Sequence, residues 1–118
     1  MLIVPKTQLD IEENTMTKYT GNYDWIFQNY QEVMTKQQDL GKSLREAGPV
    51  DEKNSHLIQL GAAAAIRAEG SVHSHVKRAL AAGATPDEIY HAIVLLTSTV
   101  GFPSVAAALS WARDIIEE

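Results

Sequence analysis

The stretch that decides the fold runs from Lys53 to Pro103 and reads KNSHLIQLGAAAAIRAEGSVHSHVKRALAAGATPDEIYHAIVLLTSTVGFP. Its first part, from Leu57 to Ala68, is apolar on nearly every side of a helix and is broken by Gln59 and Arg67. A helix without a polar face must be buried on most sides. In a chain of 118 residues, this pattern predicts that the helix lies at an interface between subunits.

The same stretch contains residues that are typical of helix ends. Asp51 is expected to cap a helix over about 52–68, and Ser71 a second helix over about 72–82, because both side chains can accept hydrogen bonds from free backbone N–H groups. Thr85-Pro86-Asp87-Glu88 is the clearest signal, since it combines an N-cap, a proline in the first turn and the Glu of a capping box. This third helix is expected to reach Val100.

Two further helical patterns flank the stretch. From Tyr23 to Ala47, apolar residues recur mostly at spacings of three, four and seven, and we expect a break near residues 34–38 because the pattern is long for a globular helix. Its aromatic residues Trp25, Phe27 and Tyr30 are interpreted as core. Pro103 is expected to start a last helix ending near Ile116. No segment alternates as a strand does, so the predicted fold is an all-α compact bundle of five to six helices.

Composition limits the possible functions. The chain is 45% apolar and 21% charged, which suits one domain with a real core. A net charge of −5 argues against nucleic-acid and anionic-membrane partners. There is no cysteine, which excludes disulfides, thiolate metal sites and thiol peroxidase chemistry. No secretory signal and no apolar run of membrane-spanning length are found, so a cytoplasmic location is expected.

The chain is expected to divide into an N-terminal arm over residues 1–20 and a single helical domain over residues 21–118. The arm shows no clear periodicity after its first residues, MLIVP. One interpretation is a flexible or surface-docked terminus. The other is an arm that packs on a neighbouring subunit through Leu2, Ile3 and Val4.

The order of these segments, with HVKRALAAGAT before the proline-started helix and GFP after it, resembles the carboxymuconolactone decarboxylase family, which includes the alkylhydroperoxidase D-like proteins. In the redox members a Cys-x-x-Cys precedes the family His, and an acidic residue lies one helix earlier. Matched on His75, the cysteine positions fall on Ala68 and Ser71, and the acidic position on His56. The resemblance implies an alkylhydroperoxidase D-like helical domain that assembles as a homo-oligomer, a trimer or a hexamer.

Three residues are candidates for chemistry. His75 occupies the position of the family His, and imidazole suits proton transfer near neutral pH. His56 lies near a helix N-terminus, which disfavours a protonated imidazole, so a neutral His56 can replace the acidic member as a proton acceptor. Ser71 lies one turn before His75 on the same face. The alternatives are that both His residues are structural or solvated, and that Ser71 only caps its helix.

Basic residues near this region are candidates for substrate binding. Arg67 and Arg78 can hold a carboxylate, although solvated helix faces are the alternative. We predict no metal site, because His73 and His75 lie about 200° apart around a helix and the chain has no His-x-x-x-His pair. No cofactor is predicted either.

The decarboxylase branch of the family also lacks the cysteine pair. Its members often show a Tyr just before the Gly-x-Pro turn and a polar residue four positions earlier, where this chain has Thr99 and Leu95. The expected function is therefore cofactor-free acid–base chemistry on some small carboxylate or lactone. The alternative is a non-catalytic module of the same fold that binds a small ligand or serves in assembly.

Overall fold

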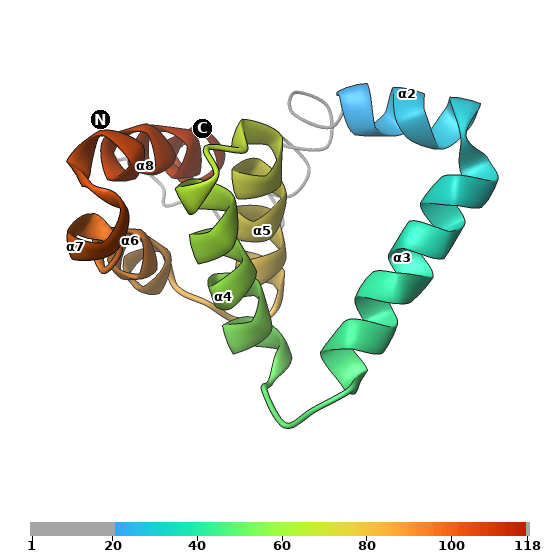
Figure 1. Cartoon of the computed structure of the whole chain (residues 1–118), viewed down its shortest axis with the longest axis horizontal. Coiled ribbons are helices and arrows are strands. Elements are labelled where there is room, and N and C mark those ends of the chain that lie inside the picture. Colours follow the sequence, from blue (N-terminus) through green and yellow to red (C-terminus); the bar gives the residue numbers. More distant parts are fainter. Residues whose placement is uncertain (1–20, 118) are drawn as a thin grey trace, which may run out of the picture.

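The computed structural model of this chain describes residues 21–117, so the predicted N-terminal arm lies outside the described residues. Within that range the regular structure is entirely α-helical, which confirms the predicted all-α fold (Figure 1). The helices are α2 (Gly21–Asn29), α3 (Gln31–Glu46), α4 (Glu52–Ala65), α5 (Glu69–Ala81), α6 (Pro86–Val94), α7 (Thr97–Val100) and α8 (Phe102–Ile116).

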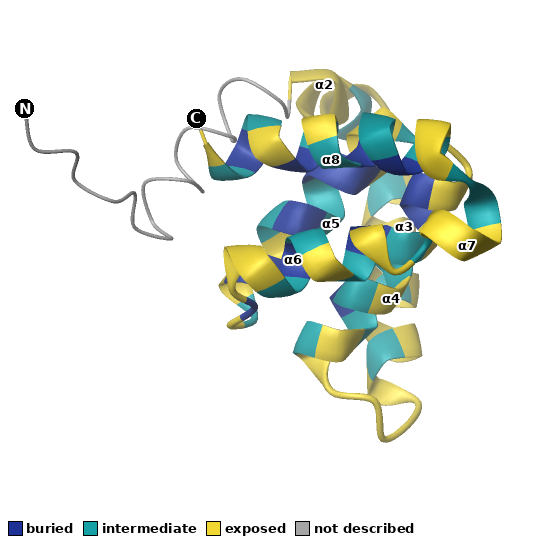
Figure 2. Ribbon diagram, turned by 90° about the vertical axis from the view of Figure 1, so that its left-hand side faces the viewer, coloured by how far each residue is buried: buried dark blue, intermediate teal, exposed yellow. Residues whose placement is uncertain are grey.

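The hydrophobic core lies among α4, α5, α6 and α8, whose buried residues face one another (Figure 2). The stripe predicted for the proline-started helix contributes Ile89 and Ile93, both fully buried. Each such side chain contributes roughly 1.5–3 kcal/mol by leaving water. Other buried apolar residues of these helices are Leu60, Ala63, Ala64, Val72, Val76, Ala79, Leu80, Val105, Ala108, Ala112 and Ile115.

The helical pattern from Tyr23 to Ala47 forms two helices that stand apart from this core (Figure 1). The break falls at Tyr30, not at residues 34–38. Neither helix buries a residue, and Trp25 is 57% exposed. The interpretation of the aromatic residues as core is therefore wrong for the single chain: the Trp25 and Tyr30 ring centroids are 6.4 Å apart, and both side chains are largely exposed.

Helix α4 is only half covered. Its inner face is buried, but Ile58 is 62% exposed and Ile66, just after the helix, is 77% exposed. The sequence predicted that this helix is buried on most sides. Within a single chain, only the inner face of α4 is buried. Large apolar side chains thus remain on the outer surface of this helix.

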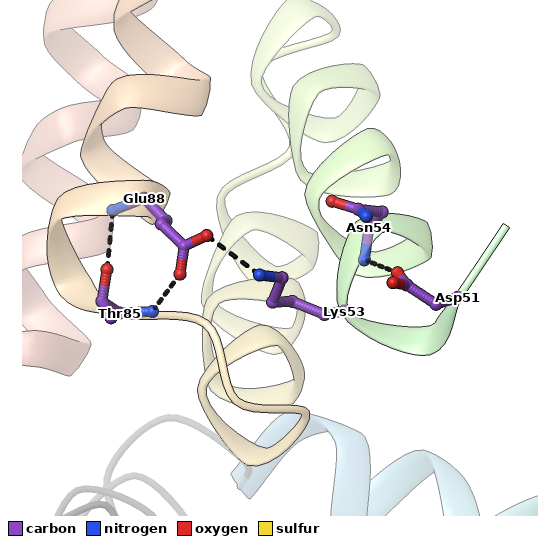
Figure 3. A network of polar contacts seen from close by, with 5 residues as sticks. All are labelled: Asp51, Lys53, Asn54, Thr85 and Glu88. Carbon is purple, nitrogen blue, oxygen red and sulfur yellow. Dashed lines mark hydrogen bonds and ion pairs between the residues drawn. The ribbon is translucent and has the colours of Figure 1, made fainter.

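Local hydrogen bonds fix where α4 and α6 begin (Figure 3). The Asn54 N–H donates to Asp51 Oδ1 at 2.8 Å, as the predicted cap requires. At the start of α6, Thr85 and Glu88 form the complete capping box. Lys53 Nζ then donates to Glu88 Oε2 at 3.0 Å, which ties the first turn of α4 to that of α6.

Three predicted boundaries are wrong. The helix starting at Pro86 breaks at Leu95 and Leu96, so α7 is separate. Helix α4 ends at Ala65, and Arg67 adopts a left-handed φ of 56° in the turn that follows. Helix α5 then begins at Glu69, so Ser71 lies inside it and is not its N-cap. Among the described helices none is long and apolar enough to cross a membrane.

Candidate functional site

The two predicted catalytic histidines meet across α4 and α5. His56 Nδ1 lies 3.4 Å from His75 Nδ1, and the ring centroids are 5.6 Å apart with the ring planes inclined by 36°. The Asp51 cap fixes the start of α4 and therefore the position of His56 in its second turn. The two histidines are 19 positions apart in sequence, and the turn at Arg67 brings them together by reversing the chain.

Both imidazoles are held in the neutral form. Burial, together with smaller electrostatic effects of Arg78, His56 and Arg45, lowers the pKa of His75 to about 4. Burial also lowers the pKa of His56, which is only 2% exposed, with smaller effects from Arg78 and Arg45 in the same direction and from Glu52 in the opposite one. A neutral imidazole has one N–H and one lone pair, so the pair can share a single proton between the facing Nδ1 atoms.

Glu52 favours one direction for that hydrogen bond. Its Oε1 atom lies 4.0 Å from His56 Nε2, one turn earlier on α4. A carboxylate at this distance is too far for a hydrogen bond but favours a hydrogen on His56 Nε2. His56 Nδ1 is then the acceptor, His75 Nδ1–H is the donor, and the second ring nitrogen of His75, Nε2, keeps its lone pair.

A cleft of about 1110 Å³ opens between the α2–α3 pair and the α4–α5 pair, and His56 and His75 are among the residues that line it. Its cationic side chains are Lys42 and Arg45 from α3 and Lys77 and Arg78 from α5. Two carboxylates, Asp39 and Glu52, also line the cleft. Because the four cationic side chains outnumber them, the cleft carries an excess of positive charge that attracts anions.

The other predicted site residues divide into two groups. Ser71 lines the cleft and is exposed, but among the described residues no hydrogen bond joins its hydroxyl to His75. Arg78 also lines the cleft. Arg67 does not border it, because its side chain turns toward α8 and donates to Ser104 Oγ at 3.2 Å.

Two residues that the sequence reasoning missed belong to this arrangement. Glu52 has a local signal, since it lies four residues before His56 and the two share a helix face. Arg45 has none, because it belongs to α3 and faces the histidines only through the placement of that helix.

The comparison with protein families gives one match, the carboxymuconolactone decarboxylase family over residues 31–114. No curated protein and no solved structure matches the chain. The matched segment spans most of the chain, from the start of α3 into the last turn of α8, and includes both histidines. The resemblance carried by the His75 segment and the Gly101-Phe102-Pro103 turn is thereby confirmed, and the chain belongs to the carboxymuconolactone decarboxylase family.

Proposed function

We propose that this chain carries out cofactor-free acid–base chemistry on a small carboxylate or lactone, with His75 as the group that exchanges a proton with the substrate. The observation that carries the proposal is the contact between two neutral histidines, with Nδ1 atoms 3.4 Å apart, at the wall of a cationic cleft. A cleft that holds His75 together with other titratable groups favours an enzyme over an inert structural role.

The proton path follows from the hydrogen-bond directions. His75 Nε2 accepts a proton from an acidic C–H or O–H of the substrate, and the positive charge of the resulting imidazolium is shared through Nδ1–H with His56 Nδ1. The Glu52 carboxylate beyond His56 stabilises that charge at 4.0 Å from His56 Nε2. Return of the proton to another atom of the substrate restores the neutral pair, so no oxidant or reductant is consumed.

The arginines connect substrate binding to basicity. Arg78 and Arg45 lower the pKa of both histidines. A substrate carboxylate that pairs with Arg78 offsets this charge, so the pKa of His75 rises when the substrate binds. His75 thus becomes a stronger base when a substrate is present.

Thiol peroxidase chemistry is not part of this proposal, because the chain has no cysteine and Ala68 and Ser71 stand at the redox positions. The alternative function, a non-catalytic binding or assembly module, is supported by the exposed apolar side chains Leu44 and Ile58 on α3 and α4. Such side chains suit contact with a second copy of the chain. Assembly as a trimer or hexamer is compatible with either function.

Binding of small anions gives the first test. The C2–H resonances of the four histidines are followed by NMR during pH titration, with and without members of a panel of small lactones and 3-oxo or unsaturated acids. A bound carboxylate should raise the pKa of His75, whereas the C2–H resonance of His91, exposed on α6, should not respond to the ligand. If no member of the panel that binds changes the titration of His75, the acid–base proposal is wrong.

Turnover gives the second test, once a substrate has been found. His75→Gln should lower kcat by roughly 10²-fold or more while leaving the fold and the oligomer intact. His91→Gln is the matched control and should keep wild-type kcat. Equal kcat in His75→Gln and wild type would exclude His75 as the catalytic base.

A further inference from the structure

A separate group of metal-ligating side chains lies where the start of α5 meets the end of α8. Glu69 and His73 are one turn apart on α5 and share a face, and Asp114 comes from the last turn of α8. One donor atom of each lies within 4.8 Å of those of the other two. His73 also lines the cleft. It lies about 200° around α5 from His75, and its Nε2 atom contacts Asp114 of α8, so this group is distinct from the His56–His75 pair.

The spacing of the donors is near that of a coordination sphere. With bonds of about 2.0–2.2 Å, donors around a tetrahedral ion lie roughly 3.3–3.6 Å apart. His73 Nε2 is 3.0 Å from Asp114 Oδ2, so an ion would replace the proton between these two atoms. The His73 side chain is 9% exposed and held in place, whereas Glu69 is exposed and reaches the same point by rotation about its side-chain bonds.

The charge of the group also suits a cation. Glu69 and Asp114 bring two carboxylates to one imidazole, and no lysine or arginine of residues 21–117 forms an ion pair with either carboxylate. The neighbouring Arg113 is bound to Glu117 at 3.0 Å. Two carboxylates and one imidazole form the mixed oxygen and nitrogen donor set that Zn²⁺ and similar transition metals accept, whereas Mg²⁺ and Ca²⁺ prefer oxygen alone.

We propose that Glu69, His73 and Asp114 bind a divalent transition-metal ion such as Zn²⁺ at the junction of α5 and α8. Three protein ligands leave at least one coordination position for water or for a donor atom of a small ligand. The sequence reasoning missed this site because it looked for paired histidines. The signal on α5 is Glu69-x-x-x-His73, and the third ligand is 41 residues beyond His73.

Direct metal titration tests the proposal on the full-length protein. After treatment with a chelator, the protein is titrated with Zn²⁺ by calorimetry and with Co²⁺ by visible absorption, with Mg²⁺ as a comparison ion. We expect one Zn²⁺ per chain, Co²⁺ d–d bands that Zn²⁺ abolishes, and no uptake of Mg²⁺ in the same concentration range. Glu69→Gln and Asp114→Asn should each weaken Zn²⁺ binding by about tenfold or more.

Controls separate this site from other sources of binding. Glu46→Gln, an exposed carboxylate on α3, should bind Zn²⁺ as wild type does, and so should His75→Gln, which removes one member of the histidine pair. Because Glu69 is exposed, Glu69→Gln keeps the fold even if Asp114→Asn does not. The proposal is wrong if wild type takes up no Zn²⁺ below about 1 mM, if Glu69→Gln binds as tightly as wild type, or if His75→Gln abolishes binding.

Discussion

Acidification should destabilise this protein through His75, and the sign follows from the pKa shift. In the unfolded chain His75 takes up a proton near its ordinary pKa of 6.5, whereas in the folded chain burial and nearby cationic groups lower the pKa to about 4. Between these two values the unfolded state binds more protons than the folded state, so a fall in pH favours unfolding. The stabilisation is complete above pH 6.5 and is lost as pH falls toward 4.

The size of the effect follows from the same shift. A change from 6.5 to about 4 corresponds to an upper limit of about 3.5 kcal/mol, since each pKa unit is worth about 1.4 kcal/mol. His75 is only partly buried, and solvent screening reduces the effect to about 1–2 kcal/mol. His56 adds a contribution of the same sign, because its pKa is also lowered by burial.

Urea unfolding of wild type and His75→Gln, followed by circular dichroism at one protein concentration and at pH 7, 6, 5 and 4, measures this contribution. Carboxylates titrate in both proteins, so their effects cancel in the difference. Wild type should lose about 1–2 kcal/mol more than His75→Gln between pH 7 and pH 4. His91→Gln, the control from the exposed side of α6, should lose as much as wild type. A difference between wild type and His75→Gln that is equal at all four pH values would refute the reasoning.

Three other predictions concern assembly, chemistry and folding. Light scattering at micromolar concentration should give three or six times the chain mass of 13.0 kDa, because Ile58 on α4 and Ile66 just after it are exposed; a mass of one chain would contradict this. Pure protein with a dithiol reductant should not reduce organic hydroperoxides, because the chain supplies no thiolate, and measurable turnover would disprove this. Thr85→Ala should lower the free energy of unfolding by about 1 kcal/mol through loss of the capping box, whereas an unchanged urea midpoint would show that the cap contributes nothing.

Several features of the fold could be predicted from the sequence because they depend on neighbours in the chain. The start of α6 at Pro86 and the start of α4 after Asp51 are set by side chains that bond to backbone groups three residues away. The burial of Ile89 and Ile93 follows from their spacing on one helix face. The family, too, was recognisable from the order of such local signals around His75, as the match over residues 31–114 confirms.

The predicted N-cap at Ser71, which is wrong, shows where local reasoning ends. Ser71 has a side chain suited to an N-cap, but α5 begins earlier, at Glu69. The Ala68 N–H bonds to the Ala63 carbonyl at 2.9 Å across the left-handed Arg67, and this compact turn leaves the chain free to enter α5 at once. A residue's capping preference cannot reveal that a neighbouring turn has already determined the helix start.

Only the tertiary structure decided how the candidate site is composed. The sequence indicated His56 and His75 as separate candidates. The 3.4 Å distance between their Nδ1 atoms depends on how α5 packs against α4 after the turn at Arg67. The sequence alone could not show that Arg45 of α3 lines the same cleft as the two histidines. Nor could it show that the aromatic residues of α2 lie outside the core. Hydrogen bonds within a helix turn are fixed by sequence spacing, whereas contacts between helices depend on packing angles that the whole core determines.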